Sequence, residues 1–335
     1  MNVKTKRILG LDYMRGMACL LVVLYHYTTR VVELFPYIGD KWHFRVSFGY
    51  MGVCIFFMLS GYLSIKLYRE DISIWKYIKN KVLRLYPCYW CAAILTFIIT
   101  SLFLVERTVS WKSLLINLTM LESFLGVDPV DGAYWTLANE LIFYAFFAIV
   151  FVILKKKSMF SYVAIAWVFI TNIIICFESK SIVYLIANKF FMAQYAHMFL
   201  AGGFIFILYS SKRKSDRMIN LLGWIFCIAT QFRLFSIGYG FFFLTSNIIL
   251  MYIATIEKQK NEYPRCIVKV LKPLSFVASI SYPFYLIHQN IGYALIVNIY
   301  KTGFQSEIII LIPIIVLMLL SYLMHKMIEM PINKK

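Results

Sequence analysis

Asp12, Arg15 and His26 interrupt the first long apolar stretch of the chain. At about 100° and 1.5 Å per residue, the three side chains share one narrow helix face, and Arg15 and His26 are about 16 Å apart along the axis. In a membrane, a charge at that depth costs at least ~2.5–3.5 kcal/mol, so such a face must border the bundle interior or a water-filled cavity. We expect a polar path with Asp12 and Arg15 at one end and His26 at the other. The alternative is a local Asp12–Arg15 pair that anchors the helix end.

Two later apolar stretches also contain ionisable side chains. Glu140 follows Trp135 in one of them, and His288 precedes Gln289 and Asn290 in the other. A carboxylate that orients an imidazole is a common arrangement for a general base, and the expected depths of Glu140 and His26 suggest such a pair. The alternatives are an ion pair that seals the bundle at Glu140 and hydrogen bonding between helices at His288.

Lys81 and Arg84 lie three residues apart and share a helix face at the start of the third apolar stretch. Because Arg15 enters from the same side, the three cations are predicted to hold a polyanionic ligand such as a phosphorylated cofactor. Ordinary positive charge beside a membrane is the alternative. No metal site is expected, because the candidate ligands are single residues on different helices without a metal-binding spacing.

The composition indicates which elements position these residues. Hydrophobic residues make up 61% of the 335 residues and charged residues 15%, outside the range of soluble domains. We predict an all-α polytopic membrane protein, a single membrane-embedded domain over 1–335 without a separate soluble domain, in which the first stretch is a retained helix. Runs of about 20 apolar residues predict ten spans: 8–28, 48–66, 83–105, 134–154, 158–177, 190–209, 218–236, 238–256, 274–298 and 306–327.

The basic residues alternate between the loops. Of 34 Lys and Arg, 24 lie in segments on the side of the N-terminus and 9 on the opposite side. The positive-inside rule therefore predicts that both termini are cytoplasmic, and it explains the basic charge without nucleic acid. Segment 110–125 is too short to span and predicts an interfacial or re-entrant helix. Segment 70–80 predicts an amphipathic helix lying on the membrane.

Five blocks, in order and with matching topology, resemble the acyltransferase 3 family of integral membrane acyltransferases. The resemblance covers nearly the whole chain, and Arg15 and His26 have the spacing of that family's opening signature. Lys81 departs from the pattern, because the family often has Arg there. The blocks are 10–16 (GLDYMRG) with 22–26 (VVLYH), 52–61 (GVCIFFMLSG), 81–87 (KVLRLYP), 135–144 (WTLANELIFY) and 281–288 (SYPFYLIH).

Members of that family typically have ten membrane helices and move an acyl group, usually acetyl, onto extracytoplasmic glycans. The resemblance thus implies O-acetylation of a surface or exported polysaccharide from cytoplasmic acetyl-CoA, in a bacterial cytoplasmic membrane. Its expected partners are a glycan or glycolipid acceptor, membrane lipids and the machinery of glycan synthesis or export. The alternatives are a glycan or metabolite transporter (flippase), in which the buried His, Glu and Arg form a relay, and an assembly subunit without chemistry.

The implied roles divide the candidate residues into two groups. Arg15, Arg84 and Lys81, with Asp12 beside them, are expected to bind the donor. His26 is expected to act as general base or brief acyl carrier, oriented by Glu140. Acceptor or oxyanion binding is expected of the remaining candidates, which are Trp135, His288, Gln289 and Asn290.

Overall fold

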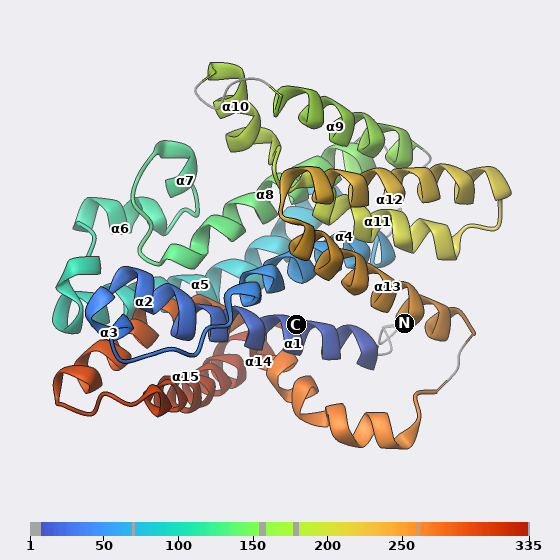
Figure 1. The fold of residues 1–335 in the computed structure, drawn as a ribbon. Coiled ribbons are helices and arrows are strands. Elements are labelled where there is room, and N and C mark those ends of the chain that lie inside the picture. Colours follow the sequence, from blue (N-terminus) through green and yellow to red (C-terminus); the bar gives the residue numbers. More distant parts are fainter. Residues whose placement is uncertain (1–7, 69–70, 154–158, 177–180, 260–261, 334–335) are drawn as a thin grey trace.

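The computed structural model describes residues 8–68, 71–153, 159–176, 181–259 and 262–333, and these residues form helices and no strands (Figure 1). Within the described residues, 7 helical segments are long and apolar enough to cross a membrane. The fold is therefore that of a multi-pass membrane protein, as predicted. The main helices of these segments are α1 (Leu9–Tyr25), α4 (Gly52–Lys66), α5 (Ile74–Phe103), α8 (Trp135–Phe147), α13 (Ile237–Gln259), α14 (Arg265–Lys301) and α15 (Leu311–Met324).

The other three predicted spans also coincide with helices, but these are less regular. Helix α9 (Phe160–Ile174) is apolar and short. Helices α10 (Ile182–Phe191) and α11 (Ala196–Ser210) form a pair bent by 43°, which raises the number of candidate spans to 8 if the pair is one span. Helix α12 (Lys214–Leu234) has Asp216 in its first turn and Arg233 in its last. The described chain therefore supports seven or eight of the ten predicted spans by length and composition.

Glycines allow the central helices to approach closely. A Cβ at Gly16 of α1 would lie 2.2 Å from the carbonyl oxygen of Leu274 in α14, and one at Gly52 of α4 would lie 2.5 Å from that of Ala18 in α1. Small residues at helix contacts are the usual way in which membrane helices pack backbone against backbone. Helix α1, with its polar face, is therefore held between α4 and α14 (Figure 1).

Short helices gather at the end of the bundle away from the start of α1, at the left of Figure 1. They include α2 (Val31–Leu34), α3 (Pro36–Gly39), α6 (Trp111–Asn117) and α7 (Glu122–Leu125). Helices α6 and α7 confirm that segment 110–125 does not span. The segment predicted as an amphipathic helix over 70–80 is described from residue 71, and from Ile74 on it forms the first turns of α5. Ser73 caps the first turn of α5 by accepting from the Lys76 backbone N–H, and α5 then runs unbroken through the predicted boundary.

Two helical irregularities occur near the predicted histidines. The backbone changes from α-helical to a π-helical turn at His26–Arg30, directly after α1. Helix α14 contains Pro283, which removes a backbone N–H from the helix five residues before His288. Single π-turns occur frequently at functional sites, so both features draw attention to the region where His26 and His288 lie.

Candidate active site

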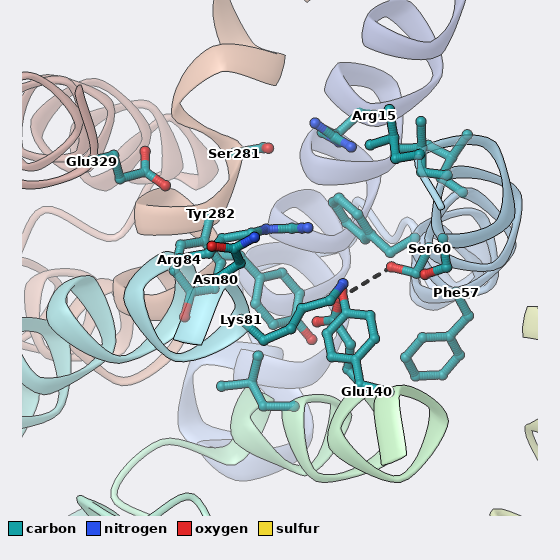
Figure 2. Close-up of a pocket in the computed structure, with 18 of the residues that line it drawn as sticks. Arg15, Phe57, Ser60, Asn80, Lys81, Arg84, Glu140, Ser281, Tyr282 and Glu329 are labelled. Carbon is teal, nitrogen blue, oxygen red and sulfur yellow. Dashed lines mark hydrogen bonds between the residues drawn. The ribbon is translucent and has the colours of Figure 1, made fainter. Parts of the chain in front are cut away.

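A pocket of about 760 Å³ lies between α1, α4, α5, α8 and α14. Figure 2 shows Arg15 from α1, Ser60 from α4, Lys81 and Arg84 from α5, and Glu140 from α8 directed into the same space. Asp12 and Ile332 also line it, so it lies at the end of the bundle where the described chain begins and ends. The four residues predicted to bind a donor therefore share one cavity.

Glu140 is the centre of a small polar cluster within this pocket. Its Oε1 accepts hydrogen bonds from Ser60 Oγ at 3.1 Å and from the Tyr144 hydroxyl. The ammonium of Lys81 lies 3.4 Å from the centroid of the Tyr144 ring, a distance at which cation and ring attract each other. A carboxylate, a phenol and an ammonium thus orient one another at the wall of the cavity.

A second carboxylate faces the pocket from the far side. Glu329 lies opposite Glu140 in Figure 2 and accepts a hydrogen bond from His325 Nδ1 at 2.6 Å. Glu329, Asp12 and Glu140 line the same cavity as the cations Arg15, Lys81 and Arg84. A polyanion bound there must therefore compete with protein carboxylates for these cations.

The inner end of the pocket is formed by Thr136 and Tyr285. Their hydroxyl oxygens are 2.9 Å apart, and Tyr285 also donates to the carbonyl of Ala133 at 3.3 Å. The centroid of the Tyr285 ring lies 5.3 Å from that of His288. The Tyr285 side chain therefore lies against both the pocket and His288.

His26 and His288 lie together beyond this layer. Their ring centroids are 4.9 Å apart with planes inclined by 71°. His26 Nδ1 is 2.8 Å from the Tyr293 hydroxyl, and the Tyr27 hydroxyl donates to the carbonyl of His288 at 2.6 Å. The structure thus brings the two predicted histidines, from α14 and from the end of α1, into one site.

Glu140 does not form the expected pair with His26. Its hydrogen-bond partners among the described residues are Ser60 and Tyr144, whereas the hydroxyl of Tyr293 lies against Nδ1 of His26. The reason is the depth of α8 in the bundle: the start of α8 packs against Tyr285 of α14, so Glu140, one turn further along α8, is level with the pocket that Arg15, Lys81 and Arg84 line. Sequence placed Glu140 too close to the histidines because it assumed that α8 begins at the membrane surface.

The loop before α8 braces the histidine site. Asp131 accepts from the backbone N–H of Asn290 at 2.8 Å, and the Asn290 side chain donates to the carbonyl of Val130 at 2.8 Å. Arg107 Nε donates to Asn290 Oδ1 at 3.3 Å. The Asn290 amide is thus engaged with protein groups, and its predicted contact with an acceptor stays a prediction. Gln289 is buried, and its Oε1 has no hydrogen-bond partner among the described residues.

A row of partly buried aromatic rings leads from Trp135 to His26. The Trp135 ring centroid lies 4.9 Å from that of Tyr195, whose hydroxyl is 3.5 Å from that of Tyr50. The Tyr50 ring lies 5.8 Å from Tyr25, and Tyr25 lies 5.2 Å from His26. Trp135, predicted to contact the acceptor, therefore belongs to an aromatic surface that ends at the histidine pair.

Sequence reasoning missed several residues of these two sites. Ser60 lies in one of the five blocks but was not among the predicted site residues, although its hydroxyl donates to Glu140. Tyr144 had a detectable signal, because it lies four residues after Glu140 and so on the same helix face. The remaining ones reach the sites through contacts between distant helices and loops, and had no signal in the sequence: Tyr27, Arg107, Asp131 and Tyr293.

Two buried carboxyls outside the spans predict how stability depends on pH. Burial raises the pKa of Asp131 to about 6 and that of Glu122 to about 7. Each holds its proton more tightly in the folded than in the unfolded chain, so the stability that these two groups contribute is fully present below about pH 4 and is lost as pH rises to about pH 7. We expect the unfolding temperature in detergent to fall across this range, and to fall less in Asp131→Asn and Glu122→Gln. An identical slope in wild type and both variants would contradict this.

Comparison with known proteins identifies the family of the chain. The family model described as an acyltransferase domain, acyltransferase 3, matches residues 8–325. A protein of Acidianus two-tailed virus that is named as an acetyltransferase, ORF330, is 23% identical over 284 residues, covering 82% of this chain and 80% of the viral protein. No solved structure matches the chain. Because the family model covers nearly the whole chain, the protein belongs to the acyltransferase 3 family and is a multi-pass membrane acyltransferase.

Proposed function

We propose that the protein transfers an acetyl group from acetyl-CoA to a hydroxyl of a surface or exported glycan. The donor enters the pocket from the cytoplasm, and transfer takes place at the histidine pair near the opposite face of the membrane. The charge distribution supports this orientation, because 24 of 34 Lys and Arg lie on the side of the termini. The membrane is then the cytoplasmic membrane of a bacterial cell, with both termini inside.

The observation that carries the proposal is the position of the pocket relative to the histidines. Three cations line the pocket, and Tyr285 at its inner end contacts His288. Arg15 and His26 are about 16 Å apart along α1. A donor with phosphates at one end and a thioester at the end of a linear arm has this shape: Arg15, Lys81 and Arg84 bind the phosphates, and the arm runs inward past Thr136.

Side chains of the pocket wall hold these cations in position before the donor binds. Glu140, Ser60 and Tyr144 hold Lys81 and the face of α5 in place through the contacts described above. Asp12 and Glu329 line the same pocket as Arg15 and Arg84. The phosphates of the bound donor compete with these carboxylates for the cations.

At the histidine pair the reaction is acyl transfer from sulfur to oxygen. The acceptor oxygen forms a bond to the acetyl carbon, the carbon–sulfur bond breaks, and the hydroxyl proton passes through an imidazole to the leaving thiolate. The tetrahedral intermediate has a negatively charged oxygen, which a nearby N–H or O–H donor stabilises. Imidazole and phenol groups suited to both tasks lie within this site.

The aromatic row from Trp135 to Tyr25 is the proposed acceptor surface, because apolar sugar-ring faces stack on aromatic rings. Trp135→Ala should raise the KM for the glycan about tenfold, the loss of roughly 1.4 kcal/mol of binding, with little change in the KM for acetyl-CoA. Trp75→Ala is the matched control, because Trp75 is 78% exposed at the start of α5. Equal effects of the two variants on the glycan KM would argue against this acceptor surface.

The direct test compares surface glycans of cells with wild-type protein and with His26→Ala, at equal membrane protein levels. Loss of one acetyl ester in the variant supports acetyl transfer and identifies the acceptor by mass spectrometry and NMR. If acetylation of the exported glycan is unchanged but its export fails, the result favours a transporter of this glycan over an enzyme that acetylates it.

A further inference from the structure

The hydrogen bond of His288 fixes which ring nitrogen holds its proton. Nδ1 lies 2.6 Å from the backbone carbonyl oxygen of Tyr285. A carbonyl oxygen can only accept, so Nδ1 must be the donor and must hold a hydrogen. In the neutral imidazole the other nitrogen, Nε2, is then the one with the free lone pair.

That second nitrogen has no protein partner. His288 is 0% exposed, and its Nε2 has no hydrogen-bond partner among the residues that the structure describes. A buried polar atom without a partner is energetically unfavourable, so such atoms are uncommon in structures. Here the unpartnered atom is a basic nitrogen beside His26, at the place proposed for transfer.

Three contacts hold the backbone around His288 in this arrangement. Tyr27 donates to the His288 carbonyl at 2.6 Å, and Tyr134 donates to the carbonyl of Leu286 at 3.2 Å. Asp131 accepts from the Asn290 N–H at 2.8 Å. Groups from the end of α1 and the start of α8 therefore fix this turn of α14, and with it the proton position on His288.

His26 has a different partner. Its Nδ1 faces the Tyr293 hydroxyl at 2.8 Å, a group that can either donate or accept. If Tyr293 donates to Nδ1, the neutral ring of His26 holds its proton on Nε2. The two rings, 4.9 Å apart, then present one nitrogen that accepts and one that donates.

We propose, building on the acetyl transfer described above, that His288 Nε2 is the general base of the reaction. It takes the proton of the acceptor hydroxyl as the oxygen–carbon bond forms, and returns it to the sulfur as the carbon–sulfur bond breaks. His26, with Tyr293 donating to its Nδ1, donates from Nε2 to the negatively charged oxygen of the intermediate. This assignment reverses the roles expected from the sequence, in which His26 was the base.

Glutamine variants separate the two roles, because a side-chain amide donates hydrogen bonds but does not take up a proton at neutral pH. His288→Gln should lower the rate at saturating donor and acceptor by about 10²–10⁴-fold, the usual contribution of a general base. His26→Gln keeps an N–H donor and should stay within about tenfold of wild type, with His26→Ala lower by about 10²–10³-fold. His197→Gln is the control, because His197 is buried in α11 and binds Gln231.

The rates are measured as transfer of labelled acetyl from acetyl-CoA to glycan in inverted membrane vesicles. Each variant is first shown to match the wild type in membrane level and in elution from a sizing column. Severe loss in His26→Gln with near-normal transfer in His288→Gln overturns the assignment. No transfer by the wild type overturns the proposed function, and the assignment with it.

A spectroscopic measurement tests the tautomer without any activity. The chain has 5 histidines, so the imidazole nitrogens of ¹⁵N-histidine-labelled protein can be assigned from single glutamine variants. The His288 signals should report a protonated Nδ1 and an unprotonated Nε2 at neutral pH. A protonated Nε2 on the neutral ring of His288 overturns the assignment even if acetyl transfer is observed.

Discussion

Replacing Arg84 with glutamine should raise the KM for acetyl-CoA by about 10- to 100-fold, because a charged hydrogen-bonding partner contributes about 1.5–3 kcal/mol. Turnover at saturating donor should stay near the wild-type value, since Arg84 lines the pocket and the histidines lie beyond Tyr285. A change in KM alone is the signature of binding shared by the ground state and the transition state. Titration of purified protein with coenzyme A checks the binding directly.

Lys79→Gln is the matched control for this experiment. Lys79 lies on the same helix and is exposed, but it does not line the pocket. Its removal changes the net charge by the same amount and should leave coenzyme A binding unchanged. If both variants weaken binding equally, general positive charge rather than the pocket attracts the donor. If neither does, the donor binds elsewhere.

Gly61→Ala should destabilise the protein severely. A Cβ at Gly61 would lie 1.8 Å from the carbonyl oxygen of Phe199 in α11. In the same helix contact, a Cβ at Gly202 of α11 would lie 1.9 Å from the carbonyl oxygen of Met58. Both clashes are with backbone, so α4 and α11 must separate. Overpacking a well-packed core typically costs about 1–3 kcal/mol and occasionally more, and we expect the upper end here. Because Ser60 precedes Gly61, residual folded protein should also lose donor binding.

Gly238→Ala is the control for the glycine experiment, since nothing lies within 4 Å of the position of its Cβ. The measurement is the temperature at which detergent-solubilised protein loses its monodisperse peak on a sizing column. Gly61→Ala should lose it well below wild type, whereas Gly238→Ala should not. A Gly61→Ala protein as stable as wild type would mean that α4 and α11 do not pack backbone to backbone.

The shared pocket of the predicted cations was predictable because its residues are near in sequence or on one helix face. Lys81 and Arg84 are three residues apart, and Asp12 and Arg15 are likewise; helical periodicity alone places each pair on one face. Charge at membrane depth must be directed inward. The structure confirms that all four line one cavity.

The hydrogen-bond partner of His26 could not be predicted from the sequence in the same way. Pairing Glu140 with His26 required the level at which α8 begins, and that level is fixed by contacts between Thr136 and Tyr285, which are 149 residues apart. Tyr293 is one of 24 tyrosines, and no local pattern marks it as the partner of His26. Such contacts depend on the relative shift of whole helices, which composition and periodicity do not determine.

Hydropathy predicted the positions of the long apolar helices well and those of the other helices less well. The spans around α9 and α12 were predicted from runs whose helices are short or have charged ends. Segment 70–80 was assigned to the membrane surface because it is amphipathic. Its helix continues into α5 because no residue near its end stops the helix.

The most direct test of the account supplies labelled acetyl-CoA to sealed membrane vesicles of both orientations. Inverted vesicles, which expose the cytoplasmic face, should incorporate the label into glycan, and right-side-out vesicles should not. Arg84→Gln should lower incorporation at limiting donor, and saturating donor should restore it. Equal labelling by both orientations, or labelling that is the same with and without the protein, would contradict transfer from a cytoplasmic donor pocket to an outer histidine site.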